Sequence, residues 1–127
     1  MHVEGPSVAP ARVQPRMLWR AVIEVKCTGR LLGEDTAYLP RLAQLIESET
    51  GRVSIVFETL EIESYSPEFP LNHIEFFKKW RDRIHKIAVV HSLKSIAFAV
   101  ATVSLASNTN IKGFSSASEA LGWLRTP

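Results

Sequence analysis

Short apolar stretches typical of β-strands alternate with helical patterns along most of this 127-residue chain. Strands are predicted over residues 17–27, 53–58, 87–90 and 111–114, and helices over residues 40–50, 72–84, 93–106 and from 116 onward. Alternation of this kind indicates an α/β domain in which successive strands run parallel and are joined by right-handed helical crossovers. We therefore expect one domain with a mostly parallel sheet.

The chain is expected to divide into two parts. Residues 1–16 contain three prolines and lack the apolar stretch of a secretory signal. This composition predicts a flexible N-terminal tail, followed by the folded domain over residues 17–127.

Charge, cysteine content and hydropathy restrict the possible binding partners and cellular location of the domain. The formal charge of +2 is too small to indicate a nucleic-acid partner. The single cysteine excludes an intrachain disulfide and suits a reducing compartment. The longest apolar run, Ser95–Ala106, is shorter than the roughly 20 residues that cross a bilayer, so no transmembrane segment is predicted. We expect a cytoplasmic protein.

Four stretches of the sequence together resemble a known family. They are EDTAYLPRLAQLIES at 34–48, RVSIVFE at 52–58, HKIAVVHS at 85–92 and IKGFSSASEALGWL at 111–124. In this order and spacing they resemble the SpoIIAA-like family, a branch of the STAS superfamily, over about residues 17–125. The resemblance implies a single STAS-like α/β domain with a four- to five-stranded, mostly parallel sheet and about four helices.

The same resemblance bears on regulation. Relatives of this kind look like anti-sigma-factor antagonists, in which the switch is a serine of a D-S-S-G-like motif at the start of a helix. The corresponding stretch here, EIESYSPEFPLN at 61–72, lacks that motif. Ser64 and Ser66 remain as phosphorylation candidates only, because a phosphate there would lie among glutamates without a nearby arginine cluster.

His91 and Ser92 join the predicted strand 87–90 to the helix that follows. Adjacent side chains diverge, so these two do not readily pair as base and nucleophile, and no G-x-S-x-G elbow surrounds Ser92. Ser92 is therefore interpreted as the N-cap of the helix, with contact to a ligand as the alternative.

The carboxyl edge of the predicted sheet is the first candidate binding surface. Ligands of open α/β sheets favour the carboxyl ends of parallel strands. The loop predicted over residues 59–71 and the joint at 91–92 should both lie there. A small anionic ligand would meet helix N-termini and a histidine at this edge, and a protein partner is the other possible occupant. The candidate binding residues are Tyr65, Ser66, His91 and Ser92.

The predicted helix Leu93–Ala106 is apolar on all sides and carries one charge, Lys94. Such a helix must be covered on more than one side, and its own sheet covers only one. A second copy of the chain, a lipid or the N-terminal tail could supply the rest, and a homodimer is the favoured interpretation. The candidate self-association residues are Ile96, Phe98, Val100 and Val103. The alternative function is a carrier or sensor of a lipid or other apolar ligand that uses this helix.

Recognisable reaction chemistry is missing from the sequence. The histidines lack zinc-binding spacing, and Glu58, Glu61 and Glu63 are too few for a defined cation site, so no metal is predicted. Cys27 continues the apolar face of the first strand and is interpreted as a buried small residue. Residues 76–86 are interpreted as an amphipathic surface helix, whose basic side leaves peripheral lipid contact open. We expect a non-catalytic binding or regulatory module without a cofactor.

Overall fold

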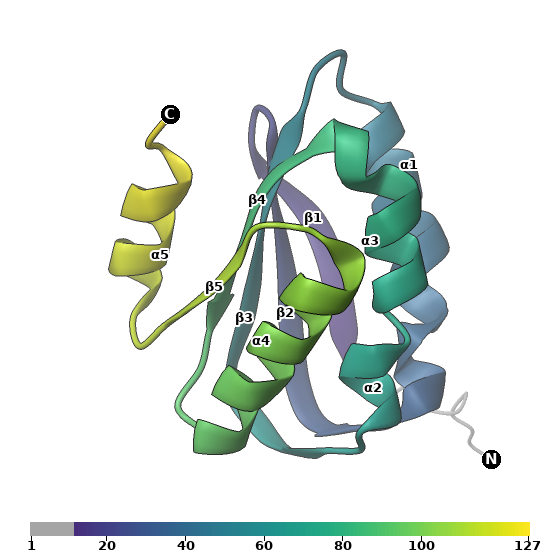
Figure 1. Ribbon diagram of the computed structural model, residues 1–127, viewed down its shortest axis with the longest axis vertical. Coiled ribbons are helices and arrows are strands. Elements are labelled where there is room, and N and C mark those ends of the chain that lie inside the picture. Colours follow the sequence, from purple (N-terminus) through teal and green to yellow (C-terminus); the bar gives the residue numbers. More distant parts are fainter. Residues whose placement is uncertain (1–11) are drawn as a thin grey trace, which may run out of the picture.

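A five-stranded mixed sheet forms the centre of the molecule, and the computed structural model describes residues 12–127 (Figure 1). The strands follow one another in the order β1-β2-β3-β4-β5. Their bounds are Val13–Trp19, Val22–Leu31, Val53–Tyr65, Ile84–Val90 and Ile111–Phe114. β1 is antiparallel to β2, and the other three pairings are parallel. The predicted α/β class and the mostly parallel sheet are confirmed.

The first two strands correct the sequence analysis, which predicted one strand over residues 17–27. A tight turn at Arg20 and Ala21 instead folds the chain into a hairpin. Ala21 has φ +64°, in the left-handed region that non-glycine residues rarely occupy, so the sequence carries no glycine or asparagine signal for this turn. β1 begins at Val13, inside the segment predicted as tail. Residues 1–11 of that predicted tail lie outside the described residues.

Helices cover the two faces of the sheet unequally (Figure 1). α1 (Leu39–Glu47), α2 (Glu68–Leu71), α3 (Ile74–Trp80) and α4 (Lys94–Ser107) lie on one face. α5 (Ala117–Leu124) packs on the other. Short 3-10 helices, η1 (Gly33–Tyr38) and η2 (Arg81–Arg83), precede α1 and β4.

Each face of the sheet has its own hydrophobic core. Residues that alternate along the central strands point to opposite sides, as the pleat requires. Ile23, Ile55 and Ile87 are fully buried in the main core under α1, α3 and α4. Val56 and Val90 face α5 and form the smaller second core with its buried residues. β4 and the first part of β3, residues 53–57, are therefore buried on both faces, which explains their mostly apolar sequences.

β3 is longer than predicted, and this shapes the carboxyl edge of the sheet. The sequence analysis predicted a loop over residues 59–71, but β3 continues to Tyr65 and α2 follows after a short turn. β4 pairs with β3 only as far as Glu58 opposite Val90. Beyond that point β3 pairs with β2 alone, up to Tyr65 opposite Leu31. The edge is therefore stepped, with the β2–β3 pair extending past β4.

Candidate functional site

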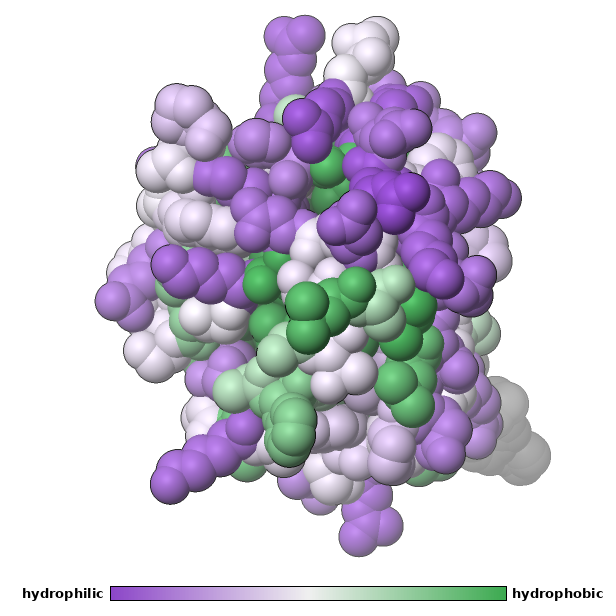
Figure 2. All heavy atoms as spheres, in the orientation of Figure 1, coloured by the Kyte–Doolittle hydropathy of each residue, from purple (hydrophilic) through white to green (hydrophobic). Residues whose placement is uncertain are grey.

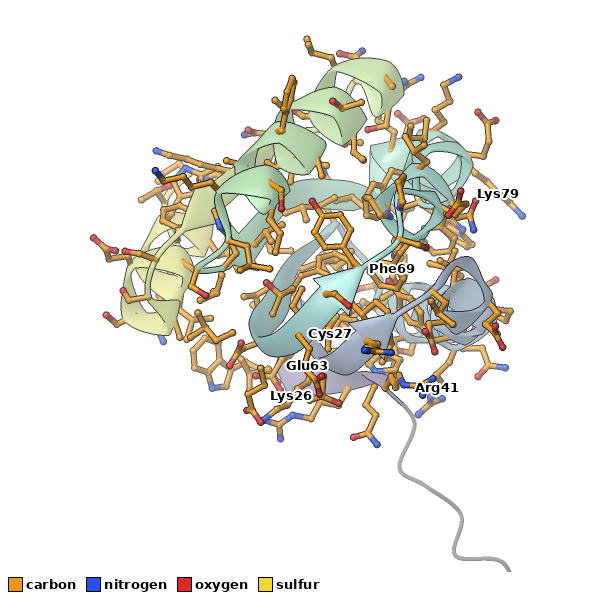
Figure 3. The ribbon with its side chains drawn as sticks, turned by 90° about the horizontal axis from the view of Figure 1, so that it is seen from below. Lys26, Cys27, Arg41, Glu63, Phe69 and Lys79 are labelled. Carbon is orange, nitrogen blue, oxygen red and sulfur yellow. The ribbon has the colours of Figure 1, made fainter. Side chains whose placement is uncertain are left out.

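An apolar cavity of about 90 Å³ lies between the sheet and helices α2, α3 and α4. Seen from below in Figure 3, Phe69 of α2 points into the space between the sheet and the helices, whereas Lys79 extends away from the molecule. The sheet contributes Phe57, Ile62, Val89 and Ile111 to the wall. Helix α4 contributes Ile96, Ala99, Val100 and Val103.

Close packing of η1 against α2 positions the wall that carries Phe69. A Cβ on Gly33 would lie 3.0 Å from the Cβ of Glu68, so only glycine fits this approach without a shift. The Asn72 side-chain amide donates to the Gly33 carbonyl at 3.3 Å and joins the end of α2 to η1. Phe69 is consequently held in the core with 8% of its surface exposed.

His73 is the most polar side chain of the cavity wall, and both of its ring nitrogens are already bonded. Its Nδ1–H donates to the Phe69 carbonyl at 2.7 Å, because a carbonyl can only accept. Its Nε2 accepts from the Tyr38 hydroxyl, also at 2.7 Å. The wall residue Thr59 likewise uses its hydroxyl internally, donating to the Val90 carbonyl at 2.7 Å.

The protonation of this pair follows from its burial. Desolvation lowers the pKa of His73 from its ordinary value to about 4, against the opposing effect of hydrogen bonding to the backbones of Phe69 and Pro70. Desolvation also raises the pKa of Tyr38 well above its ordinary value. Both groups are neutral near pH 7. Within residues 12–127, the two buried side-chain atoms without a hydrogen-bond partner belong to Ser66 and His91, and neither residue lines the cavity.

A groove between α2 and α4 adjoins the cavity. The groove has a volume of about 350 Å³, and four residues line both spaces: Tyr65, Pro70, Ala99 and Val103. Leu71 and Phe98 form further groove wall, and both are exposed. In Figure 2, hydrophobic colour gathers over α4 and continues toward α2 and α3, whereas hydrophilic groups crowd the upper part of this face. The apolar groove therefore borders the cavity at the surface.

The four predicted binding residues do not form one site. Ser66 follows β3, and its backbone N–H donates to the Leu31 carbonyl at the far end of β2. His91 follows β4, and its N–H donates to the Phe114 carbonyl of β5. The stepped edge separates the two pairs, and no hydrogen bond in the described part of the chain joins them. Of the four, only Tyr65 lines the cavity.

His91 and Ser92 have structural surroundings that differ from the prediction. α4 begins at Lys94 with Leu93 in the N-cap position, so the prediction that Ser92 caps this helix is wrong. Ser92 is exposed. The His91 ring lies directly on the backbone of Gly113, where an added Cβ would be only 2.6 Å from Nε2. The bare glycine of β5 therefore makes room for this histidine.

The acidic stretch beside Tyr65 is a charged strand surface. Glu61 and Glu63 are exposed, and Glu61 pairs with Lys26 of β2 at 2.9 Å. Ser64 is exposed, whereas the Ser66 hydroxyl is buried. Carboxylates at this position oppose an anionic ligand or a phosphate electrostatically.

The four predicted self-association residues do not share an outer face. Ile96 and Val103 are 7% and 5% exposed, and with Val100 they line the cavity. Only Phe98, 79% exposed, points outward. The prediction of one surface made from all four residues is therefore wrong. Ile96, Val100 and Val103 instead form part of the cavity wall.

Cys27 is buried, as predicted, with 1% of its surface exposed. Burial, with a smaller contribution from Glu58 and Asp35, raises the pKa of its thiol to about 12. Residues 12–127 contain no cluster of three or more histidine, cysteine or acidic side chains that could hold a metal ion. Across the same residues, no helix is both long and apolar enough to cross a membrane.

The chain can now be compared with known proteins. A family model described as SpoIIAA-like matches residues 22–125. An uncharacterised protein of the DUF3478 family from Shewanella loihica PV-4, described as having a SpoIIAA-like fold, has a similar structure with a TM-score of 0.70. Its sequence is 16% identical, and the match covers 94% of this chain and 99% of the Shewanella chain. The anti-sigma factor antagonist SpoIIAA in its unphosphorylated form is 10% identical with a TM-score of 0.63, and the match covers 91% of this chain and 99% of the SpoIIAA chain. No curated protein matches. The predicted STAS-like fold is confirmed.

Proposed function

This chain belongs to the SpoIIAA-like family, and from that premise we propose that it is a non-catalytic module that binds a small apolar ligand in the cavity beneath α4. The observation that carries the proposal is a nearly all-apolar cavity that lies next to an open groove between α2 and α4 and shares four lining residues with it. Ligand sites in proteins are typically concave, apolar and already formed in this way.

The polarity of the wall selects the class of ligand. The side chains of His73 and Thr59 already form hydrogen bonds with other groups of the protein. The cavity therefore has few hydrogen-bonding groups left for a polar molecule. An alkyl chain or small ring needs no partner there. Tyr65 and Ser95 line the groove, and their hydroxyls are the groups that could meet the polar end of an amphipathic ligand. The other function predicted from the sequence, an anion or protein site at the carboxyl edge, has less support because that edge is stepped and acidic.

The energy of binding would come from apolar burial. Each methylene moved out of water contributes about 0.8 kcal/mol. A chain of about six carbons in the cavity and groove would therefore contribute about 5 kcal/mol before the entropic costs of binding. We expect chain length to affect affinity more than the chemistry of the headgroup.

The test is calorimetric titration of the purified, delipidated protein with decanol and with decanoate. We expect both to bind, with a negative change in heat capacity, because both bury the same tail. Ala99→Phe should weaken binding at least tenfold, because Ala99 lies where the cavity meets the groove and a phenyl ring would occupy that space.

The matched control is Ala97→Phe, two residues earlier on α4, where the side chain is exposed and lines neither space. This variant should bind decanol like the wild type. Absence of binding by the wild type, or equal binding by Ala99→Phe, would contradict the proposal. Binding of decanoate but not of decanol would instead favour an anionic ligand.

A further inference from the structure

The outer side of α4 carries large apolar side chains with little to cover them. Phe98 is 79% exposed and Leu105 is 85% exposed, and a spacing of seven residues places them two turns apart on one stripe. Ala101 and Thr102 lie between them and are also exposed. The inward side of α4 lines the cavity, whereas the outer stripe borders the groove through Phe98 and Thr102.

The charge on α4 favours a protein surface over a membrane as the occupant of the outer stripe. Helices that lie on membranes usually carry several lysines or arginines along the polar face beside their apolar face. α4 has Lys94 at its first position and no further charged residue as far as Ser107. A large apolar stripe without flanking cations is typical of a helix that packs on another helix.

We propose that the outer stripe pairs with the same stripe of a second copy, the two α4 helices running antiparallel about a two-fold axis near Ala101 and Thr102. The spacing is self-complementary in this arrangement, because Phe98 of one copy then faces Leu105 of the other and the reverse. The short side chain of Ala101 lets the two helix backbones approach closely.

The ends of the helix favour antiparallel over parallel pairing. In the antiparallel pair Lys94 lies beside the last turn of the other α4, where the helix dipole favours a cation, as it does for Arg81, which donates to the Ser107 carbonyl at 3.1 Å. That last turn ends at Asn108, whose φ of 55° closes the helix in the left-handed conformation. A parallel pair would instead bring the two lysines together.

The small size of the outer stripe limits the expected affinity of the dimer. A helix of 14 residues is about 21 Å long, so the contact is at the small end of specific interfaces. We expect a dimer that dissociates in the micromolar range. The proposal does not rest on the cavity, but Phe98 and Thr102 also line the groove, so the dimer would cover part of the surface through which the proposed ligand reaches the cavity.

Single-cysteine variants test the arrangement, since the native Cys27 is buried and does not interfere. Under mild oxidation Thr102→Cys should cross-link to itself, because position 102 lies next to the axis. Ala97→Cys should not, because its two copies would be separated by roughly 13 Å along the helix.

Sedimentation over a concentration series completes the test. Phe98→Lys should shift the protein to monomer with an unchanged circular dichroism spectrum, whereas Leu60→Lys, at an exposed leucine of β3, should leave the dimer intact. A wild type that stays monomeric at millimolar concentration overturns the proposal, as does self-cross-linking of Ala97→Cys. A monomer that cosediments with anionic vesicles would assign the stripe to a lipid surface instead.

Discussion

At the scale of single residues, the most constrained group is the buried pair of His73 and Tyr38. The two side chains bond to each other at 2.7 Å, and His73 also holds the Phe69 carbonyl. The rings of Phe57, Phe69 and Phe77 surround the imidazole, with centroids between 4.9 and 5.7 Å away. A charged imidazole would therefore lose its hydration without gaining a carboxylate partner.

This burial predicts a loss of stability in mild acid. Above pH 6.5 His73 is neutral in both the folded and the unfolded chain. Because its folded pKa is about 4, only the unfolded chain takes up the proton as the pH falls from 6.5 toward 4. The free energy of unfolding should therefore fall by about 3 kcal/mol across this range from His73 alone.

Urea unfolding at several pH values measures that slope. The double variant Tyr38→Phe with His73→Phe should lose this part of the pH dependence. Tyr38→Phe alone should lower stability but keep the dependence, because His73 stays buried and able to titrate. Identical slopes in the wild type and the double variant would assign the acid sensitivity to other groups.

At the scale of elements, α5 depends on one buried cation. Lys86 of β4 is 6% exposed, and its ammonium group donates to the carbonyls of Trp123 and Thr126 at 3.0 and 2.9 Å. The same group lies 4.9 Å from the centre of the Trp123 ring. A cation at the C-terminal end of a helix is stabilised by the free carbonyls there. Lys86 therefore fastens the end of α5 to the sheet.

Replacing Lys86 with methionine tests this attachment. The variant keeps the apolar stem but leaves the carbonyls at the end of α5 without their donor, so the free energy of unfolding should fall by about 2–4 kcal/mol. Hydrogen exchange should increase across residues 117–124. Lys112→Met is the control, because Lys112 is exposed and contacts the Phe114 and Trp123 rings only from outside. The Lys112→Met substitution should lower the free energy of unfolding by less than about 1 kcal/mol.

Sequence reasoning located some elements closely and missed others for physical reasons. The strand Ile111–Phe114 matches the prediction and the helix Lys94–Ser107 nearly does, because each is a distinct apolar block. The helix predicted from residue 116 onward is also present as α5, and the Ser116 hydroxyl at its N-cap accepts from the Glu119 N–H at 3.3 Å. The helix predicted over residues 72–84 is shorter in the structure, because α3 begins at Ile74 with His73 in the N-cap position and ends at Trp80.

The candidate site was harder to predict than the fold. A cavity arises where packed side chains leave space, and its walls come from strands and helices far apart in the sequence. A helix that is apolar all round has no polar face to indicate its orientation, so Ile96 and Phe98 looked equivalent although one is buried and the other exposed. The role of His73 had no signal in the sequence, because its partner Tyr38 is 35 positions away.

At the scale of the whole molecule, the two faces of the sheet are packed differently. The face under α5 holds a small core in which Ala88, Val90 and Ala120 are completely buried. The opposite face has the larger core, and its part beneath α4 contains the cavity. Interiors of proteins are normally close-packed, so space retained on one face identifies the part of the molecule that can accept a ligand.

Two alanine-to-leucine substitutions compare the faces directly. Ala99→Leu, at the half-buried cavity wall, adds methyl groups where space exists, so the free energy of unfolding should stay the same or rise by up to about 1 kcal/mol. Ala120→Leu adds the same groups to a completely buried position of α5 and should cost about 1–3 kcal/mol. Chemical denaturation of ligand-free protein measures both values. Equal destabilisation by the two substitutions would mean that the cavity closes in solution, and the site proposed beneath α4 would then lack the space that its ligand requires.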